Sequence, residues 1–231
     1  MSQPASASHS ERITPPAPDE VHVWVADLGS GPDELTRRFA ATTVAERERA
    51  SKFWRREDGD RYLSAHGALR LVLAGYLATD PLSIQFETGE HGKPFLQHAT
   101  LEFNLSHSSD LALIAVAEGR RVGVDVERLR PMPDLEDLAP RVCTTDELVI
   151  LTSLAEPLRT HAFLGVWTRK EALAKATGEG IRGVMRDAQS DMRGWTVAEL
   201  RDLPGYAGCV AAEGDGWHVV RRDLTDSNGR R

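Results

Sequence analysis

Residues 122–127 read Val-Gly-Val-Asp-Val-Glu, and this alternation is the feature that most constrains the fold. A period of two is the pattern of a β-strand with one apolar face, so Asp125 and Glu127 project from the same opposite face. The strand follows residues 111–117, which are apolar on both faces. We therefore expect the acidic strand to be central in its sheet, with Gly123 leaving room for a ligand.

Two neighbouring carboxylates with no basic residue between them repel each other unless a cation binds there, and hard oxygen ligands suit Mg²⁺. Glu171, in a helix predicted over 160–177, is the candidate for a third oxygen ligand. Lys175 follows one turn later, so both side chains can meet the same metal-bound diphosphate. The ordinary alternative for Asp125 and Glu127 is a solvated strand face. For Glu171 and Lys175 it is a surface i,i+4 ion pair.

Composition narrows the class of protein. The chain has 231 residues, 41% of them apolar, and a formal net charge of −7, which argues against broad binding to nucleic acid. No apolar run approaches the length of a membrane span. Cys143 and Cys209 form no disulfide framework and no metal-ligand spacing. We interpret them as packing residues of a cytoplasmic protein.

The remaining patterns predict helices and strands between two polar tails, residues 1–18 and 226–231. Strands are expected at 21–25, 84–86, 101–105, 111–117, 192–197, 208–212 and 217–220. Helices are expected after a Thr43–Glu46 capping box, at 60–78, from 134 to about 156, and at 160–177. The strand pair ending at 117 should continue into the acidic strand as a meander. Strand, helices and strand pair recur in each half, which predicts two related subdomains meeting near residues 118–122.

Polar residues outside the acidic motifs also suggest ligand contacts. The helix after Thr43 carries a dense basic cluster, for which a solvated helix face is the ordinary interpretation. The glycines of residues 89–94 form a turn that allows close approach of the backbone. Ser106 and His107 cannot pair as nucleophile and base, because adjacent strand residues point to opposite faces. His107 and Ser108 are better interpreted as hydrogen-bond donors at a strand end.

Taken together, the chain resembles the 4′-phosphopantetheinyl transferases, of the long single-chain kind that activates surfactin-type peptide synthetases. The resemblance runs from about residue 43 to residue 183, in order and with the family's spacing. The matching blocks are Arg49, Lys52-Phe53-Trp54, Glu57-Asp58 and Arg61; Gly92-Lys93-Pro94; Phe103-Asn104-Leu105-Ser106-His107-Ser108; Gly123-Val124-Asp125-Val126-Glu127; and Trp167-x-x-Lys170-Glu171-Ala172-x-x-Lys175-x-x-Gly178-x-Gly180. Two departures are Glu46, where relatives often have a basic residue, and Val142-Cys143, which replaces an aromatic pair before Glu147.

The resemblance implies an α+β fold of two pseudo-symmetric subdomains, 19–118 and 119–225. Each would be a small, mostly antiparallel sheet packed with helices, with coenzyme A in the cleft between them. Asp125, Glu127 and Glu171 would hold Mg²⁺ against the diphosphate of coenzyme A. The residues implied to contact coenzyme A are Arg49, Arg61, Lys93, Ser106, His107, Asp125, Lys170 and Lys175.

The implied reaction transfers 4′-phosphopantetheine from coenzyme A to a serine of an apo acyl or peptidyl carrier protein and releases adenosine 3′,5′-bisphosphate. Glu171 would take the serine proton and Lys175 would stabilise the departing oxygen, which makes them the expected catalytic residues. We expect a cytoplasmic monomer that binds neither nucleic acid nor membrane. A non-catalytic coenzyme A-binding module and a Mg²⁺-dependent phosphodiesterase or nuclease stay open as alternatives.

Overall fold

The structure, a computed structural model, describes residues 12–89, 92–97, 99–178 and 193–224. They form two compact units, one from residues 1–15 and 32–84 and the other from residues 16–31 and 85–231, each as far as it is described. Strands on both sides of residue 118 share one core in the second unit. The predicted division into halves at that residue concerns an internal repeat and stays a prediction.

Residues 1–11 of the first predicted tail and the whole of the second, residues 226–231, lie outside the described residues. Residues 12–18 make specific contacts instead of forming a free tail. The Ile13 amide donates to the Gly75 carbonyl within the first unit, and Arg120 donates to the Pro18 carbonyl within the second.

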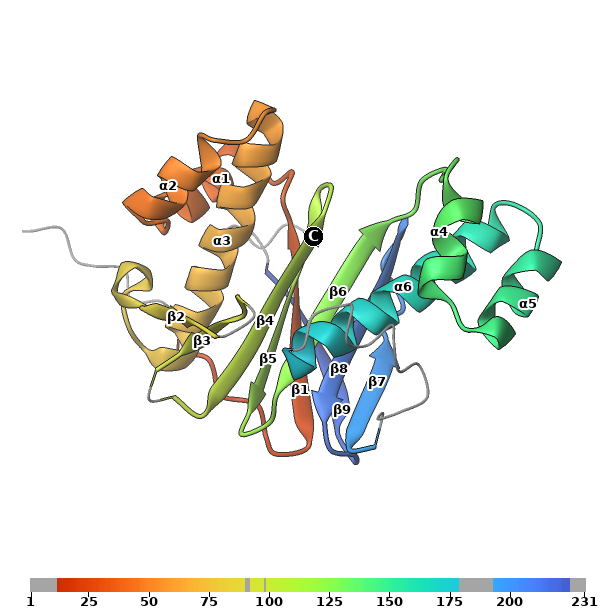
Figure 1. The fold of residues 1–231 in the computed structure, drawn as a ribbon. Helices are drawn as coiled ribbons and strands as arrows, with labels where there is room; N and C mark the ends of the chain where they lie inside the picture. The colour runs from red at the N-terminus through yellow and green to blue at the C-terminus, as the bar shows by residue number, and fades with distance from the viewer. Residues whose placement is uncertain (1–11, 90–91, 98, 179–192, 225–231) are drawn as a thin grey trace, which may run out of the picture. The chain divides into compact units, whose positions relative to one another are not determined.

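The first unit is helical (Figure 1). Its elements are α1 (Pro32–Ala40), α2 (Val44–Ala50), α3 (Arg56–Leu77) and the short 3₁₀ helix η1 (Pro81–Ser83). The predicted Thr43–Glu46 capping box opens α2, since the Thr43 hydroxyl accepts the Glu46 amide and the Glu46 carboxylate accepts the Thr43 amide. Gly67 lets α3 approach α1, because a Cβ there would lie 2.1 Å from the Arg38 carbonyl oxygen.

The second unit contains three sheets and three helices among its described residues. The first sheet has the order β4 (Leu101–Ser108), β5 (Leu111–Glu118), β1 (Glu20–Asp27), β9 (His218–Asp223), and the second has the order β6 (Val122–Arg128), β8 (Tyr206–Glu213), β7 (Trp195–Glu199). The third pairs β2 (Phe86–Thr88) with β3 (Pro94–Leu96). The helices are α4 (Leu135–Val142), α5 (Thr145–Ser153) and α6 (Leu158–Thr177). All strand pairs are antiparallel except β1 with β9, so the predicted α+β class is confirmed.

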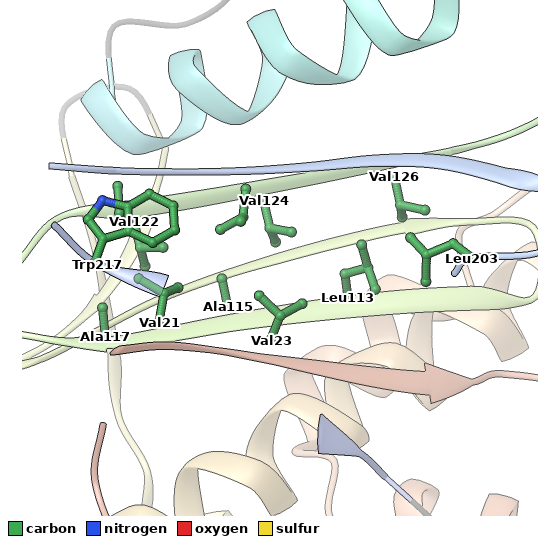
Figure 2. Packing of buried hydrophobic residues seen from close by; sticks show 12 residues of the cluster. Val21, Val23, Leu113, Ala115, Ala117, Val122, Val124, Val126, Leu203 and Trp217 are labelled. Atoms are coloured by element: carbon green, nitrogen blue, oxygen red, sulfur yellow. The ribbon is translucent and has the colours of Figure 1, made fainter. Parts of the chain in front are cut away.

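One apolar core joins the two larger sheets. Figure 2 shows the valines of β6 facing side chains of β1 and β5, with Trp217 at one end. The members of this core are Val21, Val23, Leu113, Ala115, Ala117, Val122, Val124, Val126, Leu203, Val210, Ala212 and Trp217. The alternation read from residues 122–127 thus gives β6 its apolar face, as predicted.

Helix α6 covers the other face of β6 and β8 (Figure 1). Ala172, Leu173 and Ala176 of α6 form a second cluster with Cys209 and Ala211 of β8. Both cysteines are free thiols, Cys209 in this cluster and Cys143 packed beside α4. Their interpretation as packing residues is therefore confirmed. None of the described helices has the length and apolar character needed to cross a bilayer.

Two expectations for the sheets are wrong. Strands β4 and β5 pair as predicted, but β6 does not continue them as a meander, because it pairs with β8 in another sheet. Strand β6 is also an edge strand and not a central one. It is nevertheless buried over Val122–Val126, because the shared core covers one face and α6 covers the other.

Candidate active site

Asp125 is the most enclosed carboxylate of the predicted site, with 4% of the residue exposed. Its neighbours Val124 and Val126 point into the shared core, so Asp125 projects toward the side covered by α6. Burial raises its pKa, and the ammonium group of Lys175 acts in the opposite direction. A buried carboxylate of this kind requires a compensating cation.

Lys175 provides that cation in the structure. Its Nζ lies 2.6 Å from Asp125 Oδ1, and it also donates to the hydroxyl oxygen of Ser106 at 3.1 Å. The Ser106 hydroxyl in turn donates to Asp125 Oδ1 at 2.8 Å. The predicted residues Asp125, Lys175 and Ser106 therefore form one connected group, contributed by β6, α6 and β4.

Glu127 lies two residues further along β6 and is half-buried. Its Oε2 accepts a hydrogen bond from the Ser108 hydroxyl at 2.9 Å. Burial raises the pKa of Glu127, the Ser108 hydrogen bond opposes this rise, and the charge of Asp125 adds to it. The two acidic residues of the strand thus share one electrostatic environment, as their spacing predicts.

Glu171 belongs to the same environment from the side of α6. Burial raises the pKa of Glu171, and the negative charges of Asp125 and Glu127 raise it further. Lys175 acts in the opposite direction. Arg130 and Lys175 both act on Glu127, so two cations oppose three carboxylates that repel one another, and the cluster is short of positive charge.

The donor set fits a hard divalent cation. Asp125 Oδ2 is buried and accepts no hydrogen bond within the part of the chain that the structure describes. A buried oxygen in this state is available to a ligand. In that same part of the chain, no three His, Cys, Asp or Glu side chains already form a metal-binding cluster. The carboxylates are electrostatically coupled, and Lys175 holds one oxygen of Asp125.

Gly123 does not leave room for a ligand, and that expectation is wrong. A Cβ built on Gly123 would lie 2.1 Å from the Ala172 carbonyl oxygen and 2.4 Å from the Ala176 amide nitrogen. The space next to the glycine is therefore filled by the backbone of α6. The glycine brings the helix that carries Glu171 and Lys175 against the strand that carries Asp125.

Comparison with known proteins shows the family to which the chain belongs. A family profile described as the 4′-phosphopantetheinyl transferase superfamily matches residues 121–225, and one described as 4′-phosphopantetheinyl transferase, N-terminal, matches residues 31–119. The 4′-phosphopantetheinyl transferase HetI of Nostoc sp. is 36% identical over 214 residues, which cover 86% of this chain and 90% of the relative. The chain belongs to the 4′-phosphopantetheinyl transferase superfamily.

Other members of the superfamily are also similar to this transferase. A phosphopantetheinyl transferase of Thraustochytrium sp. is 32% identical over 205 residues, covering 81% of this chain and 71% of the relative. The transferase Sfp of Bacillus subtilis is 29% identical over 150 residues, covering 64% of this chain and 66% of the relative. The predicted family and enzyme class are confirmed, and the surfactin-type subgroup stays a prediction.

The predicted coenzyme A contacts of this transferase lie in several places. Arg49 and Arg61 belong to the helical unit, where Arg49 stacks over the Tyr62 ring and Arg61 lies 3.4 Å from Asp58. His107 is exposed near the end of β4.

Lys93 and Lys170 each contact protein oxygens. Lys93 donates to the Val122 carbonyl at 2.9 Å and to the Ala176 carbonyl at 3.4 Å, and burial lowers its pKa. Lys170 is buried and donates to Glu147 at 2.8 Å and to the Val142 carbonyl. The structure therefore does not bring Lys170 together with Asp125, and it shows Lys170 joining α6 to the end of α4 and the first turn of α5.

Glu46 and Glu147, the acidic residues at or beside the two departures, both cap helices, whereas nothing in the structure explains the identity of Val142-Cys143. Glu46 caps α2 and accepts from Arg70 at 2.9 Å, so it serves the helical unit. Glu147 forms a second capping box with Thr144 at the start of α5 and also pairs with Lys170. Val142, on the preceding helix, supplies the carbonyl that Lys170 binds. These acidic residues stabilise helices and their contacts.

Sequence reasoning missed Asn104 and the acceptor of Ser108. The Asn104 side chain accepts the Val124 amide at 2.9 Å, and the Ser108 hydroxyl bonds to Glu127. The available signal was periodicity: Asn104, Ser106 and Ser108 alternate along β4 as Asp125 and Glu127 alternate along β6. Nothing in the sequence indicated that these two strands, from different sheets, lie side by side.

Proposed function

We propose that this transferase moves the 4′-phosphopantetheine group of coenzyme A onto a serine hydroxyl of an apo acyl or peptidyl carrier protein, with Mg²⁺ as its metal. The observation that carries the proposal is the buried Asp125 carboxylate, whose Oδ1 is held by Lys175 while its Oδ2 accepts no hydrogen bond from the described residues. Asp125, Glu127 and Glu171 would hold the metal. Bound there, Mg²⁺ supplies positive charge to the diphosphate.

Glu171 is suited to accept a proton. In the metal-free chain, burial and the charge of Asp125 raise the pKa of Glu171, so its carboxylate accepts a proton more readily than an exposed glutamate does. In the proposed reaction the carrier serine attacks the phosphorus bonded to pantetheine, and Glu171 takes the serine proton. The bond to the other phosphate breaks, and adenosine 3′,5′-bisphosphate leaves.

Lys175 is suited to stabilise the leaving phosphate. Its side chain is 29% exposed, so the ammonium group can reach a ligand as well as Asp125. Phosphoryl transfer depends mainly on positioning and on neutralisation of charge, and a lysine at this point contributes to both. Ser106 holds Lys175 and Asp125 in register through its hydroxyl.

The other basic residues are proposed to bind coenzyme A. Arg49, Arg61, Lys93 and His107 would contact its phosphates and nucleotide. Lys170 is also proposed to contact coenzyme A because it occupies a matching position of the family motif. In the structure its ammonium group donates to Glu147. We also propose a cytoplasmic monomer, since one chain carries both matched family segments.

Intact-mass measurement tests the function directly. The purified chain would be incubated with coenzyme A, Mg²⁺ and a panel of apo carriers, and a carrier gaining one phosphopantetheine group supports the proposal. Asp125→Ala should fold but lose at least about 100-fold in rate, since each 1.4 kcal/mol of lost stabilisation costs about tenfold. Glu118→Gln is the control, because Glu118 is also a strand carboxylate bonded to a hydroxyl, that of Thr100 at 2.6 Å, outside the cluster.

The other outcomes identify the rival functions. Binding of coenzyme A without modification of any carrier would indicate a binding module. Cleavage of coenzyme A in the absence of a carrier would indicate a phosphodiesterase. Transfer by Asp125→Ala at the wild-type rate would remove the carboxylate cluster from the reaction.

A further inference from the structure

Two edge strands face each other beside the carboxylate cluster. Strand β4 ends the first sheet and β6 ends the second, and their backbones are not paired in any sheet of the described residues. They are nevertheless in contact along their length. An edge strand leaves backbone groups without sheet partners, so side chains must satisfy those groups.

Side chains of β4 provide these partners at regular intervals. Asn104 accepts the Val124 amide, and the Ser108 hydroxyl oxygen accepts the Arg128 amide at 3.1 Å. Between them, Ser106 donates to Asp125. Asn104 and Ser108 therefore satisfy backbone amides of β6 in place of a ladder, and Ser106 adds a bond to the Asp125 side chain.

The bonds of Ser108 have a defined direction. A serine hydroxyl has one proton to donate, and its oxygen can accept at the same time. The Arg128 amide donates to Oγ of Ser108, and the hydroxyl donates to Oε2 of Glu127 at 2.9 Å. One oxygen of Glu127 is thus held by a group that is itself anchored to the backbone of β6. The other oxygen accepts no hydrogen bond from the residues that the structure describes, so it can bind a ligand.

We propose that Ser108 is a positioning residue for metal binding, which fixes the Glu127 carboxylate so that its second oxygen can coordinate the divalent cation. This inference rests on the proposed function. A glutamate side chain is flexible, and holding it in one orientation before the metal arrives removes an entropic cost from binding. Groups that orient metal ligands in this way typically contribute about 10- to 100-fold to metal affinity.

The decisive measurement is Mn²⁺ binding to the full chain, followed by the electron paramagnetic resonance signal of free Mn²⁺, with and without coenzyme A. We expect Ser108→Ala to weaken Mn²⁺ binding about tenfold and Ser108→Thr, which keeps the hydroxyl, to restore it. The Mg²⁺ concentration for half-maximal transfer should rise by a similar factor in Ser108→Ala. The rate at saturating Mg²⁺ should change less than threefold.

Thr100→Val is the matched control, because it removes another hydroxyl-to-carboxylate bond, with Glu118, outside the cluster. It should leave Mn²⁺ affinity unchanged. Equal weakening by Thr100→Val and Ser108→Ala would overturn the inference, and so would unchanged affinity in Ser108→Ala. Glu127→Gln distinguishes a failure of the Ser108 inference from a failure of the proposed metal site. If this variant binds Mn²⁺ as tightly as the wild type, the proposed metal ligands are wrong as well. If Glu127→Gln weakens Mn²⁺ binding but Ser108→Ala does not, the proposed function stands and Ser108 is not a positioning residue.

Discussion

Lys175 Nζ lies 2.6 Å from Asp125 Oδ1, so a lysine of α6 neutralises a buried carboxylate of β6. The side chain of Asp125 is 6% exposed, whereas that of Lys175 is 29% exposed. The carboxylate is therefore fixed, while the ammonium group retains access to solvent. This pair connects stability with activity, because the same two groups are proposed to act on the diphosphate.

Lys175→Met should lower the free energy of unfolding by about 3 kcal/mol, since it leaves the buried Asp125 charge without its cation. Urea denaturation at about pH 7 would measure the change. The double variant with Asp125→Asn should recover much of the loss, because it also removes the buried charge. A double variant no more stable than the single one would show that the pair does not contribute to stability.

Glu46 should make the stability of the helical unit depend on pH. Burial of Glu46 opposes its ionisation, but hydrogen bonds from His66, Thr43 and Arg70 outweigh burial and lower its pKa from 4.5 to about 2. The folded state therefore binds this proton more weakly than the unfolded chain. The contribution is fully present above about pH 4.5 and is lost as the pH falls toward about 2.

Glu46→Gln tests this dependence. We expect it to cost about 1–3 kcal/mol near pH 7, since the pKa change corresponds to about 3 kcal/mol before solvent screening. The difference from the wild type should shrink as the pH is lowered through 4 to 3 in urea titrations. Glu48→Gln, on the exposed side of the same helix, is the control and should stay near wild-type stability. A constant difference at every pH would contradict the assignment.

The local features of the site could be predicted from the sequence because they depend on residues close together in the chain. Alternation at residues 122–127 gives the face of Asp125 and Glu127, and the spacing of Glu171 and Lys175 gives one face of a helix. The capping box at Thr43 is equally local. Such patterns are fixed by backbone geometry whatever the strand packs against.

The pairing of β6 could not be predicted in the same way. A short connection after β5 suggested a hairpin, yet β6 pairs with β8, a strand some eighty residues later. The prediction that Gly123 leaves room for a ligand was wrong for a related reason. A glycine permits a close neighbour, and only tertiary structure shows whether that neighbour is a ligand or the helix α6. The partners of Asn104 and Ser108 depend on the same long-range packing.

Lys93 should stabilise the fold as well as bind coenzyme A. Its ammonium group bonds to carbonyl oxygens of Val122 at the start of β6 and Ala176 at the end of α6. Lys93→Met should cost about 1–3 kcal/mol, because the buried Val122 carbonyl loses this donor. Chemical denaturation would measure the cost, with the exposed Lys52→Met as control. Calorimetric titration with coenzyme A tests the proposed binding role of Lys93. Wild-type affinity for coenzyme A in Lys93→Met would show that Lys93 has a structural role only.

Gly123→Ala should be strongly destabilising, because the new methyl group would lie 2.1 Å from the Ala172 carbonyl oxygen and must push α6 away from β6. We expect a loss of about 2–4 kcal/mol and a fall in transfer rate, since the shift separates Lys175 from Asp125. Gly165→Ala is the matched control within α6, where a methyl group meets nothing within 4 Å. It should raise stability by up to about 1 kcal/mol through helix propensity alone. Thermal unfolding and transfer assays on both variants test this prediction. Equal stability and equal transfer rates in the two variants would mean that the contact at Gly123 does not set the position of the helix.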